Sequence, residues 1–425
     1  MLYLTRSSRI NNFFRCLKLP VDNFCQNMSV VINESSHDDS KKVEESNKRH
    51  ITDEDHEVAT KIQKVEATEH EKLPKRSNFV LMMGYLGKGY LGMQRNPGRK
   101  TIEEDLLTAL FKSNLIKKHQ FEDIRQLRFQ RAARTDKNVS AVRQIVSLQL
   151  PRDVNKEVIN EHLPQEIRIF GLTRVTKNFN SKQQCDGRTY RYVIPTYAFA
   201  TEDTSTFNST SEEGIDADER LKQISIIDGK PYNEYRLSKD KLDILNETLK
   251  LFEGTHNFHN FTIKVRPNDP SAHRYIMKFL CAEVFVENDT EFAVLEIIGQ
   301  SFMLHQIRKM ISLVIGICRN IITKDIIKDA LSQEKMDIPI APGLGLTLHH
   351  VHYTYYNKRY GNDGIHKPLN WEEYDKEVAQ FYRDFILKDI ICTEVEEKIT
   401  LNWLATYLTP NRFKFIERIY ENGDD

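Results

Sequence analysis

The ordered part of the chain is predicted to begin with the stretch NFVLMMGYLGKGYLG, residues 78–92. Five apolar side chains follow one another at residues 79–83, as they do in a strand that is buried on both faces. Residues 85–94 then interleave three glycines with two tyrosines. Such a turn lets the backbone approach a ligand while the rings offer stacking surfaces, or it is simply a strand turn with core tyrosines. Its spacing is not that of a P-loop or a dinucleotide fingerprint, so no nucleotide cofactor is predicted.

The segments that follow alternate between strand and helix patterns. A capping box at residues 101–104 predicts a helix through residue 111. Strands are predicted at residues 127–130, 145–150 (alternating, hence half-buried) and 188–194, with a hairpin of 282–286 and 292–298. Helices are predicted at residues 242–252 and 302–317, and over most of the chain after residue 360, where Trp371 and Trp403 can dock them. Because the strands arrive in runs, an α+β fold with antiparallel sheets is favoured over a doubly wound parallel fold.

Composition narrows the class of protein. The 425 residues are 40% hydrophobic, which suits one large or two moderate domains. The 6 cysteines are scattered without a C-x-x-C pair. This favours a reducing compartment over a disulfide framework or a thiolate zinc site. No apolar run approaches the ~20 residues that a membrane span needs.

The formal net charge of +0 hides an uneven distribution. Residues 361–425 carry 8 basic and 14 acidic side chains, whereas residues 78–360 carry 40 basic and 34 acidic ones. Residues 201–219, a polar insertion without periodicity, hold 7 of those acidic side chains and no basic one. A basic body with acidic appendages is typical of a polyanion binder, and ordinary solvated surface is the alternative.

The N-terminal segment has the composition of a targeting and linker region. Residues 1–20 contain four basic side chains and no acidic one, which predicts a mitochondrial presequence or a basic disordered tail. Residues 33–76 are polar and charged and lack aromatic residues, so they are predicted to be disordered. Basic pairs at residues 41–42, 48–49 and 75–76 could serve nuclear import.

The stretch RAARTDK, residues 131–137, contains one carboxylate among three cations. The positive charge of Arg131, Arg134 and Lys137 favours the ionised form of Asp136. An ionised carboxylate suits a nucleophile better than a general acid. The alternative is a surface turn held by ion pairs.

Two further stretches could complete a site with Asp136. A strand at RTYRY, residues 188–192, places Arg188, Tyr190 and Tyr192 on one face, where they could contact phosphates and stack on bases. In GQSFMLHQIRKM, residues 299–310, apolar neighbours surround Arg308. If Arg308 points inward it needs an anionic partner, for which Asp136 is the candidate; otherwise it snorkels to the surface. The histidines at residues 256–259 and 349–352 lack the spacing of a metal site.

Taken in this order, these segments resemble the TruA family of pseudouridine synthases, in particular its eukaryotic tRNA branch, from about residue 79 to residue 360. The similarity also includes EGTHNF at residues 253–258 and AP-x-x-GL at residues 341–346. It implies two α/β lobes related to RNA-recognition folds, with mainly antiparallel sheets joined across a basic cleft. The corresponding parts are an N-terminal extension 1–77, lobes 78–178 and 179–360, and a helical extension 361–425.

The resemblance also implies roles for individual residues. Asp136 corresponds to the catalytic aspartate, Tyr190 to the active-site tyrosine and Arg308 to the arginine that pairs with the aspartate. The reaction isomerises uridine without a hydride, a metal or a nucleotide, so no cofactor is implied. The implied partners are tRNA and other structured RNAs, in the nucleus or the mitochondrion. The residues expected to hold RNA are Lys88, Tyr90, Arg95, Arg131, Arg134, Lys137 and Arg191.

The chain departs from the family pattern next to the aspartate. The usual Lys-Gly-Val-His-Ala is replaced by residues 137–141, KNVSA. Asn138 tolerates a left-handed backbone and is expected to keep the turn, whereas Ser140 lacks an imidazole that could contact RNA. Two alternatives stay open: a non-catalytic tRNA-binding protein or chaperone on the same fold, and an unrelated ferredoxin-like α+β enzyme. The latter would hold Asp136 and Arg308 far apart.

Overall fold

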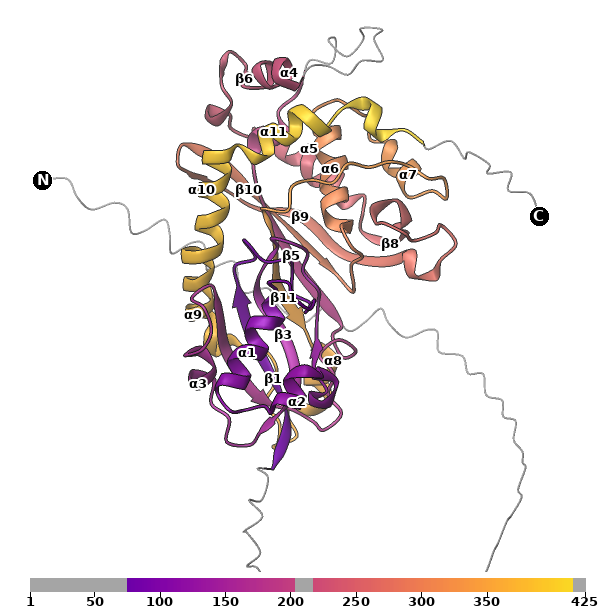
Figure 1. Ribbon diagram of the computed structural model, residues 1–425. Coiled ribbons are helices and arrows are strands. Elements are labelled where there is room, and N and C mark those ends of the chain that lie inside the picture. The colour runs from indigo at the N-terminus through magenta and orange to yellow at the C-terminus, as the bar shows by residue number, and fades with distance from the viewer. Residues whose placement is uncertain (1–74, 203–216, 416–425) are drawn as a thin grey trace, which may run out of the picture. The chain divides into compact units, whose positions relative to one another are not determined.

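The structure is a computed structural model that describes residues 75–202 and 217–415 (Figure 1). The predicted presequence, the basic pairs at residues 41–42 and 48–49, and most of the 201–219 insertion lie outside the described residues. No helix within the described ranges is long and apolar enough to cross a membrane.

One nine-stranded sheet organises the described chain, in the order β4-β1-β3-β11-β5-β10-β9-β8, with β2 paired to β3. All neighbours are antiparallel except β11 and β3, which are parallel. Its strands are β1 (Arg76–Tyr85), β2 (Gln130–Arg131), β3 (Ser140–Pro151), β4 (Ile167–Arg174), β5 (Gly187–Pro195), β8 (Gly254–Asn257), β9 (His273–Glu287), β10 (Thr290–Gly299) and β11 (Leu346–His352). The short strands β6 (Ile226–Ile227) and β7 (Lys230–Pro231) form a separate pair. Mixed helices and a mostly antiparallel sheet confirm the α+β class.

The position of β11 shows how the two halves of the chain are connected. Although β11 comes late in the sequence, it lies between β3 and β5. Thr347 and Leu348 align with Ser140 and Ala141 of β3, and Leu346 aligns with Tyr192 of β5. The two predicted lobes therefore contribute strands to a single sheet.

Helices cover the sheet and connect its strands. They are α1 (Ile102–Lys112), α2 (Lys118–Glu122), α3 (Lys156–Asn160), α4 (Ala217–Ile224), α5 (Lys239–Lys250), α6 (Gln306–Cys318), α7 (Ile326–Ala330), α8 (Thr354–Tyr360), α9 (Asp375–Phe381), α10 (Lys388–Glu397) and α11 (Ile399–Tyr407). A π-helical segment, Tyr382–Leu387, joins α9 to α10. Thr101 caps α1 by accepting a hydrogen bond from the Glu104 backbone N–H, as the sequence predicts.

Two predicted element boundaries are wrong for local reasons. Of the strand predicted at residues 127–130 only its last residue enters β2, because Ile124–Leu127 form a 3₁₀ turn and Arg128 takes a left-handed backbone with φ 52°. Helix α6 begins at Gln306 rather than at residue 302, because His305 is left-handed with φ 64°. The positive φ of His305 breaks the helical run and turns the preceding segment toward β5.

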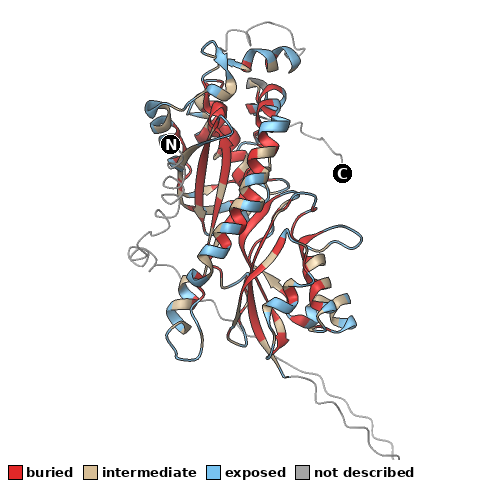
Figure 2. Cartoon of the chain, turned by 90° about the vertical axis from the view of Figure 1, so that its left-hand side faces the viewer, coloured by how far each residue is buried: buried red, intermediate tan, exposed pale blue. Residues whose placement is uncertain are grey.

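The C-terminal helices cover one face of the sheet, as Figure 2 shows for the long helical segment that crosses it. Phe381 packs against Phe170 of β4 with ring centroids 5.5 Å apart, and Asp375 pairs with Arg143 of β3 at 2.8 Å. Trp371 and Trp403 are both buried, which confirms that they dock this region. Since the helices bury its second face, β3 is buried almost throughout, and the prediction of a half-buried strand at residues 145–150 is wrong.

Gly171 leaves room for the first contact of this extension. A Cβ atom at Gly171 would lie 2.7 Å from two ring carbons of Trp371 and 2.9 Å from the ring of Tyr374. We predict that Gly171→Ala destabilises the protein by about 1–3 kcal/mol through overpacking, measured as a lower Tm. Adding Trp371→Leu should make the two effects non-additive, because the smaller side chain relieves the clash. An unchanged Tm for Gly171→Ala would contradict this account of the contact.

Candidate active site

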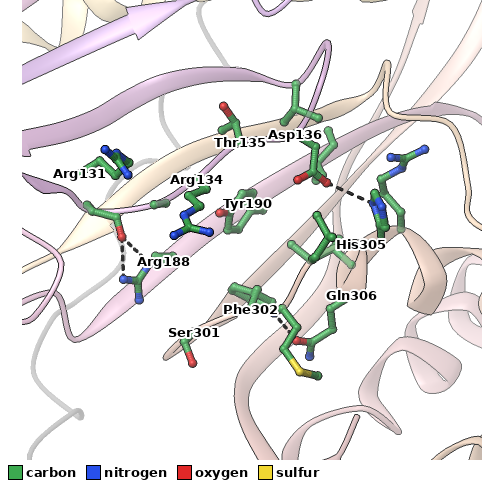
Figure 3. A pocket seen from close by; sticks show the side chains of 18 of the residues that line it. Arg131, Arg134, Thr135, Asp136, Arg188, Tyr190, Ser301, Phe302, His305 and Gln306 are labelled. Atoms are coloured by element: carbon green, nitrogen blue, oxygen red, sulfur yellow. Dashed lines mark hydrogen bonds and ion pairs between the residues drawn. The ribbon is translucent and has the colours of Figure 1, made fainter. Parts of the chain in front are cut away.

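A cavity of about 700 Å³ opens between three parts of the chain that are distant in sequence (Figure 3). They are the 130–139 loop, the start of β5 and residues 301–308. Asp136, Tyr190 and Arg308 all line this cavity. The structure therefore brings together the three predicted catalytic residues, where an unrelated fold was expected to separate them.

The glycine-rich turn, residues 85–94, packs against the loop that carries Asp136 and supports it. The Met93 N–H donates to the Thr135 carbonyl at 3.1 Å, and the Tyr85 hydroxyl lies 2.8 Å from Thr135 Oγ1. Gly92 has φ +103°, and a Cβ there would come within 2.6 Å of the Thr135 carbonyl oxygen. The glycines thus allow two backbone segments to approach each other, rather than allowing a ligand to approach.

The two tyrosines of the turn are part of the core. Tyr85 is 0% exposed and Tyr90 is 3% exposed. The Tyr90 hydroxyl donates to Asp105 at 2.7 Å, and Lys100 lies over its ring. The structure therefore contradicts the expectation that Tyr90 stacks on RNA bases, because its ring is already covered.

The two departures from the family pattern have structural roles. Asn138 has φ 62°, as expected for a residue that keeps the turn, and its Oδ1 accepts from the Gly89 N–H at 3.2 Å. Ser140 is 5% exposed, and its Oγ accepts a hydrogen bond from the Gly87 N–H at 2.9 Å. Ser140 therefore fastens the glycine-rich turn and does not face the cavity.

Arg188 joins the two loops that form opposite sides of the cavity. Its Nε and Nη2 donate to the Ala132 carbonyl at 3.2 and 2.7 Å, and its Nη1 donates to the Gln300 carbonyl at 2.5 Å. The first carbonyl belongs to the loop that carries Asp136. The second precedes the segment that carries His305 and Arg308. Tyr190 follows on the same face of β5 and also lines the cavity, as the alternation predicts.

His305 is the direct neighbour of the Asp136 carboxylate. Its Nδ1 lies 3.3 Å from Asp136 Oδ2, and the side chains are 19% and 24% exposed. Burial lowers the pKa of His305, and the attraction of Asp136 opposes that shift. His305 could not be predicted from the sequence, because nothing in its spacing reveals the left-handed backbone that aims it at Asp136.

Arg308 does not form the direct ion pair with Asp136 that was expected. Its Nε donates to the Ala341 carbonyl at 2.6 Å, and within the described ranges its guanidinium lies beyond ion-pair distance of Asp136. Burial lowers the pKa of Arg308, while the charge of Asp136 raises it. The two groups therefore interact electrostatically across the cavity without touching.

Tyr190 forms the floor of the cavity beside Phe302. The two rings meet edge to face with centroids 5.2 Å apart. Burial raises the pKa of Tyr190 to about 12, so its phenol is protonated at neutral pH. Among the residues that the structure describes, no group of three or more His, Cys, Asp or Glu could hold a metal ion.

The residues expected to bind RNA divide into two groups. Arg134 lines the cavity and is exposed, and Lys137 is exposed beside Asp136. Four others are paired with carboxylates: Lys88 with Asp389, Arg95 with Glu104, Arg131 with Glu103 and Arg191 with Glu296. Arg191 also points to the face of β5 opposite Tyr190, so it cannot reach the cavity. Lys182 and Arg274, which no pattern in the sequence singles out, line the cavity, as does the paired Arg131.

The Ser140 contact yields a prediction about stability. Ser140→Ala leaves the buried Gly87 N–H without its acceptor, which should cost about 1–3 kcal/mol of unfolding free energy. Ser332→Ala is a matched control, because the Ser332 hydroxyl also accepts from a backbone N–H, that of Glu334, but at an exposed site where water can replace it. Denaturant unfolding measures both variants. Equal, small losses for the two would contradict the role of Ser140.

Comparison with known proteins places the chain in a family. A family model described as tRNA pseudouridine synthase matches residues 249–354. The human pseudouridylate synthase 1 homolog is 47% identical over 332 residues, covering 77% of this chain and 72% of the human protein. The tRNA pseudouridine synthase 1 of Kluyveromyces lactis is 37% identical over 383 residues, covering 77% of this chain and 69% of the yeast protein. The chain therefore belongs to the TruA-type tRNA pseudouridine synthases.

Proposed function

We propose that this chain isomerises uridine to pseudouridine in tRNA with Asp136 as its catalytic carboxylate. Membership of the family makes the chain an isomerase that acts on tRNA. The convergence of Asp136, Tyr190 and Arg308 on one cavity is the observation that supports the assignment of residues. The cavity is large enough for a nucleotide that has left its stack.

The reaction requires one bond to break and another to form at the same ribose carbon. The bond from N1 of the base to C1′ breaks, the base rotates, and C5 then bonds to C1′. C5 loses a proton and N1 gains one, so the product has the atoms of the substrate and its oxidation state, and we propose that no cofactor is needed. Asp136 would form a covalent bond to the ribose or assist proton loss that yields a glycal; the position of its carboxylate is compatible with both.

Tyr190 and Arg308 would act on opposite sides of this step. As a neutral phenol, Tyr190 would cover the base. It could accept the C5 proton only while passing its own hydroxyl proton to water or to N1 of the rotated base, which gains a proton in the reaction. The charge of Arg308 attracts the Asp136 carboxylate from across the cavity. With RNA bound, Arg308 would hold that carboxylate in place or occupy the space of the flipped base.

Further properties are proposed by resemblance to the family. We propose that the substrates are uridines of the anticodon stem and loop together with other structured RNAs. The two halves of the sheet, β4-β1-β3 and β5-β10-β9-β8, would correspond to two lobes that β11 joins. The basic residues 1–20 support a mitochondrial form, and the basic pairs that follow support a nuclear form.

Asp136→Asn tests the assignment of the carboxylate. The substitution keeps the shape of the side chain and removes its nucleophilic charge, so pseudouridine formation should fall by about a thousandfold or more. The measurement is pseudouridine mapping on unmodified tRNA transcripts over a time course. The Tm and the Kd for tRNA should stay near the wild-type values.

The outcomes of this experiment separate the competing functions. Near-wild-type activity of Asp136→Asn would remove Asp136 from the chemistry. If neither form makes product on any tRNA while both bind it, the chain is a tRNA-binding protein without synthase activity.

Arg188→Lys tests whether the bridge across the cavity positions the reacting groups. Lysine keeps the charge but cannot donate to both loops in the same forked geometry. A displacement of about 1 Å at a reacting group can cost about a hundredfold in rate. We expect kcat to fall by about ten- to a hundredfold with little change in Kd for tRNA. Arg152→Lys, at an exposed arginine beyond β3, is the control. A change in Kd alone would instead make Arg188 an RNA contact.

A further inference from the structure

A second cavity, of about 370 Å³, lies against the first turn of α6. It is lined by residues between 259 and 267, by residues 335–337 and by Lys309, and is called the basic cavity below. Arg308 lines the cavity around Asp136, which is called the catalytic cavity below. The next residue, Lys309, lines the basic cavity. Arg274, at the other end of the 259–274 segment, lines the catalytic cavity as well. The two cavities are therefore neighbours on the same elements, and Figure 1 shows α6, α7, β8 and β9 gathered in one half of the fold.

The charge of the basic cavity is strongly positive. Lys264, Arg266 and Lys335 are exposed, and within the described parts of the chain their side chains have no hydrogen bond or ion pair. Lys309 lies beneath them: burial lowers its pKa, Asp337 opposes that shift, and the nearby Lys335 adds to it. The carboxylate of the cavity, Asp337, is already paired with Arg412 at 3.4 Å. Among the residues that line the cavity, these four cations therefore face a single carboxylate, which a fifth cation shares.

The backbone beneath these cations is fixed rather than loose. Asn260 is 3% exposed, and its amide donates to the Ala330 and Glu334 carbonyls at 3.0 and 2.8 Å. Its Oδ1 accepts from the Met336 N–H at 3.0 Å. The Lys309 ammonium donates to the Asn260 carbonyl at 2.9 Å. Asn260 therefore connects the segment that carries Lys335 to the loop that carries Lys264 and Arg266. Because this backbone is already ordered, ordering it on binding costs little free energy.

We propose that the basic cavity binds the phosphate backbone of tRNA outside the target nucleotide. This inference rests on the proposed function, because a tRNA whose uridine enters the catalytic cavity must continue over neighbouring surface. Four of the cations expected to serve this purpose are paired with carboxylates, whereas Lys264, Arg266 and Lys335 are free to replace counterions. Phosphate contacts of this kind fix the register of an RNA without reading its sequence.

The test compares two substrates and two triple variants in the full-length protein. Lys264→Gln/Arg266→Gln/Lys335→Gln removes the three exposed cations and keeps side chains of similar length. Lys112→Gln/Lys117→Gln/Lys118→Gln removes the same charge at exposed lysines that line neither cavity. The substrates are a full-length tRNA transcript and a short stem-loop that contains the modified uridine. Binding is measured as Kd at several salt concentrations, and activity as kcat and kcat/KM.

We expect the basic-cavity variant to bind full-length tRNA about ten- to a hundredfold more weakly, with the salt slope reduced by about 2–3. Its kcat at saturating RNA should stay within twofold of wild type on both substrates. The control triple should match wild type in every measurement.

Two results would overturn the proposal. The first is an unchanged Kd and salt slope for full-length tRNA, which would show that the basic cavity does not contact the RNA. The second is a kcat at saturating RNA that falls on both substrates, which would show that the cations support folding or catalysis. Failure of the proposed function is distinct, because it would show as absent product with wild type on both substrates, while binding remains measurable.

Discussion

The site depends on the close approach of two backbone segments, the glycine-rich turn and the loop that carries Asp136. The Thr135 carbonyl accepts from the Met93 N–H, and the Asn138 N–H donates to the Tyr90 carbonyl. A side chain at Gly92 would enter the space of the Thr135 carbonyl, and one at Gly87 would lie 2.4 Å from the Val139 carbonyl oxygen. Because both segments are buttressed by β1 and β3, Asp136 is presented to the cavity from a rigid support. In its proposed catalytic role, Asp136 would benefit from this support, since small displacements are costly in rate.

Positive charge in this protein serves two different purposes. Three arginines form ion pairs with carboxylates of the same chain, and these pairs connect loops and strands: Arg131, Arg95 and Arg191. Lys264 and Arg266 have no such partner within the described parts of the chain, and they line the basic cavity instead. The distinction matters because an ion-paired cation must lose its partner before it can bind phosphate, whereas a solvated one has only counterions to release.

The sequence predicted most strands and helices, and the resemblance predicted that Asp136, Tyr190 and Arg308 lie around one cavity. The apolar run at residues 79–83, the capping of α1 and the shared face of Arg188 and Tyr190 are local properties of the chain. Tyr90 and Arg191 were misjudged because burial and pairing are set by distant residues, Asp105 and Glu296. His305 was missed for a related reason. Its contact with Asp136 depends on one positive φ angle, which no pattern of side chains reveals.

The alternation of side chains along β5 explains why the C-terminal extension leaves the cavity open. Its residues alternate between faces, so that Arg188 and Tyr190 point to the cavity while Arg191 points to the face that the C-terminal helices cover. On that covered face, the ring of Tyr382 meets His349 of β11 and the carboxylate of Glu394 accepts from the Tyr197 hydroxyl at 2.8 Å. The first contact reaches β11, and the second reaches the 3₁₀ segment Thr196–Phe199 that follows β5. The extension therefore stiffens the junction at β11, and the relative position of Asp136 and Tyr190 depends on that junction. It does not occupy the face of the sheet where RNA would enter.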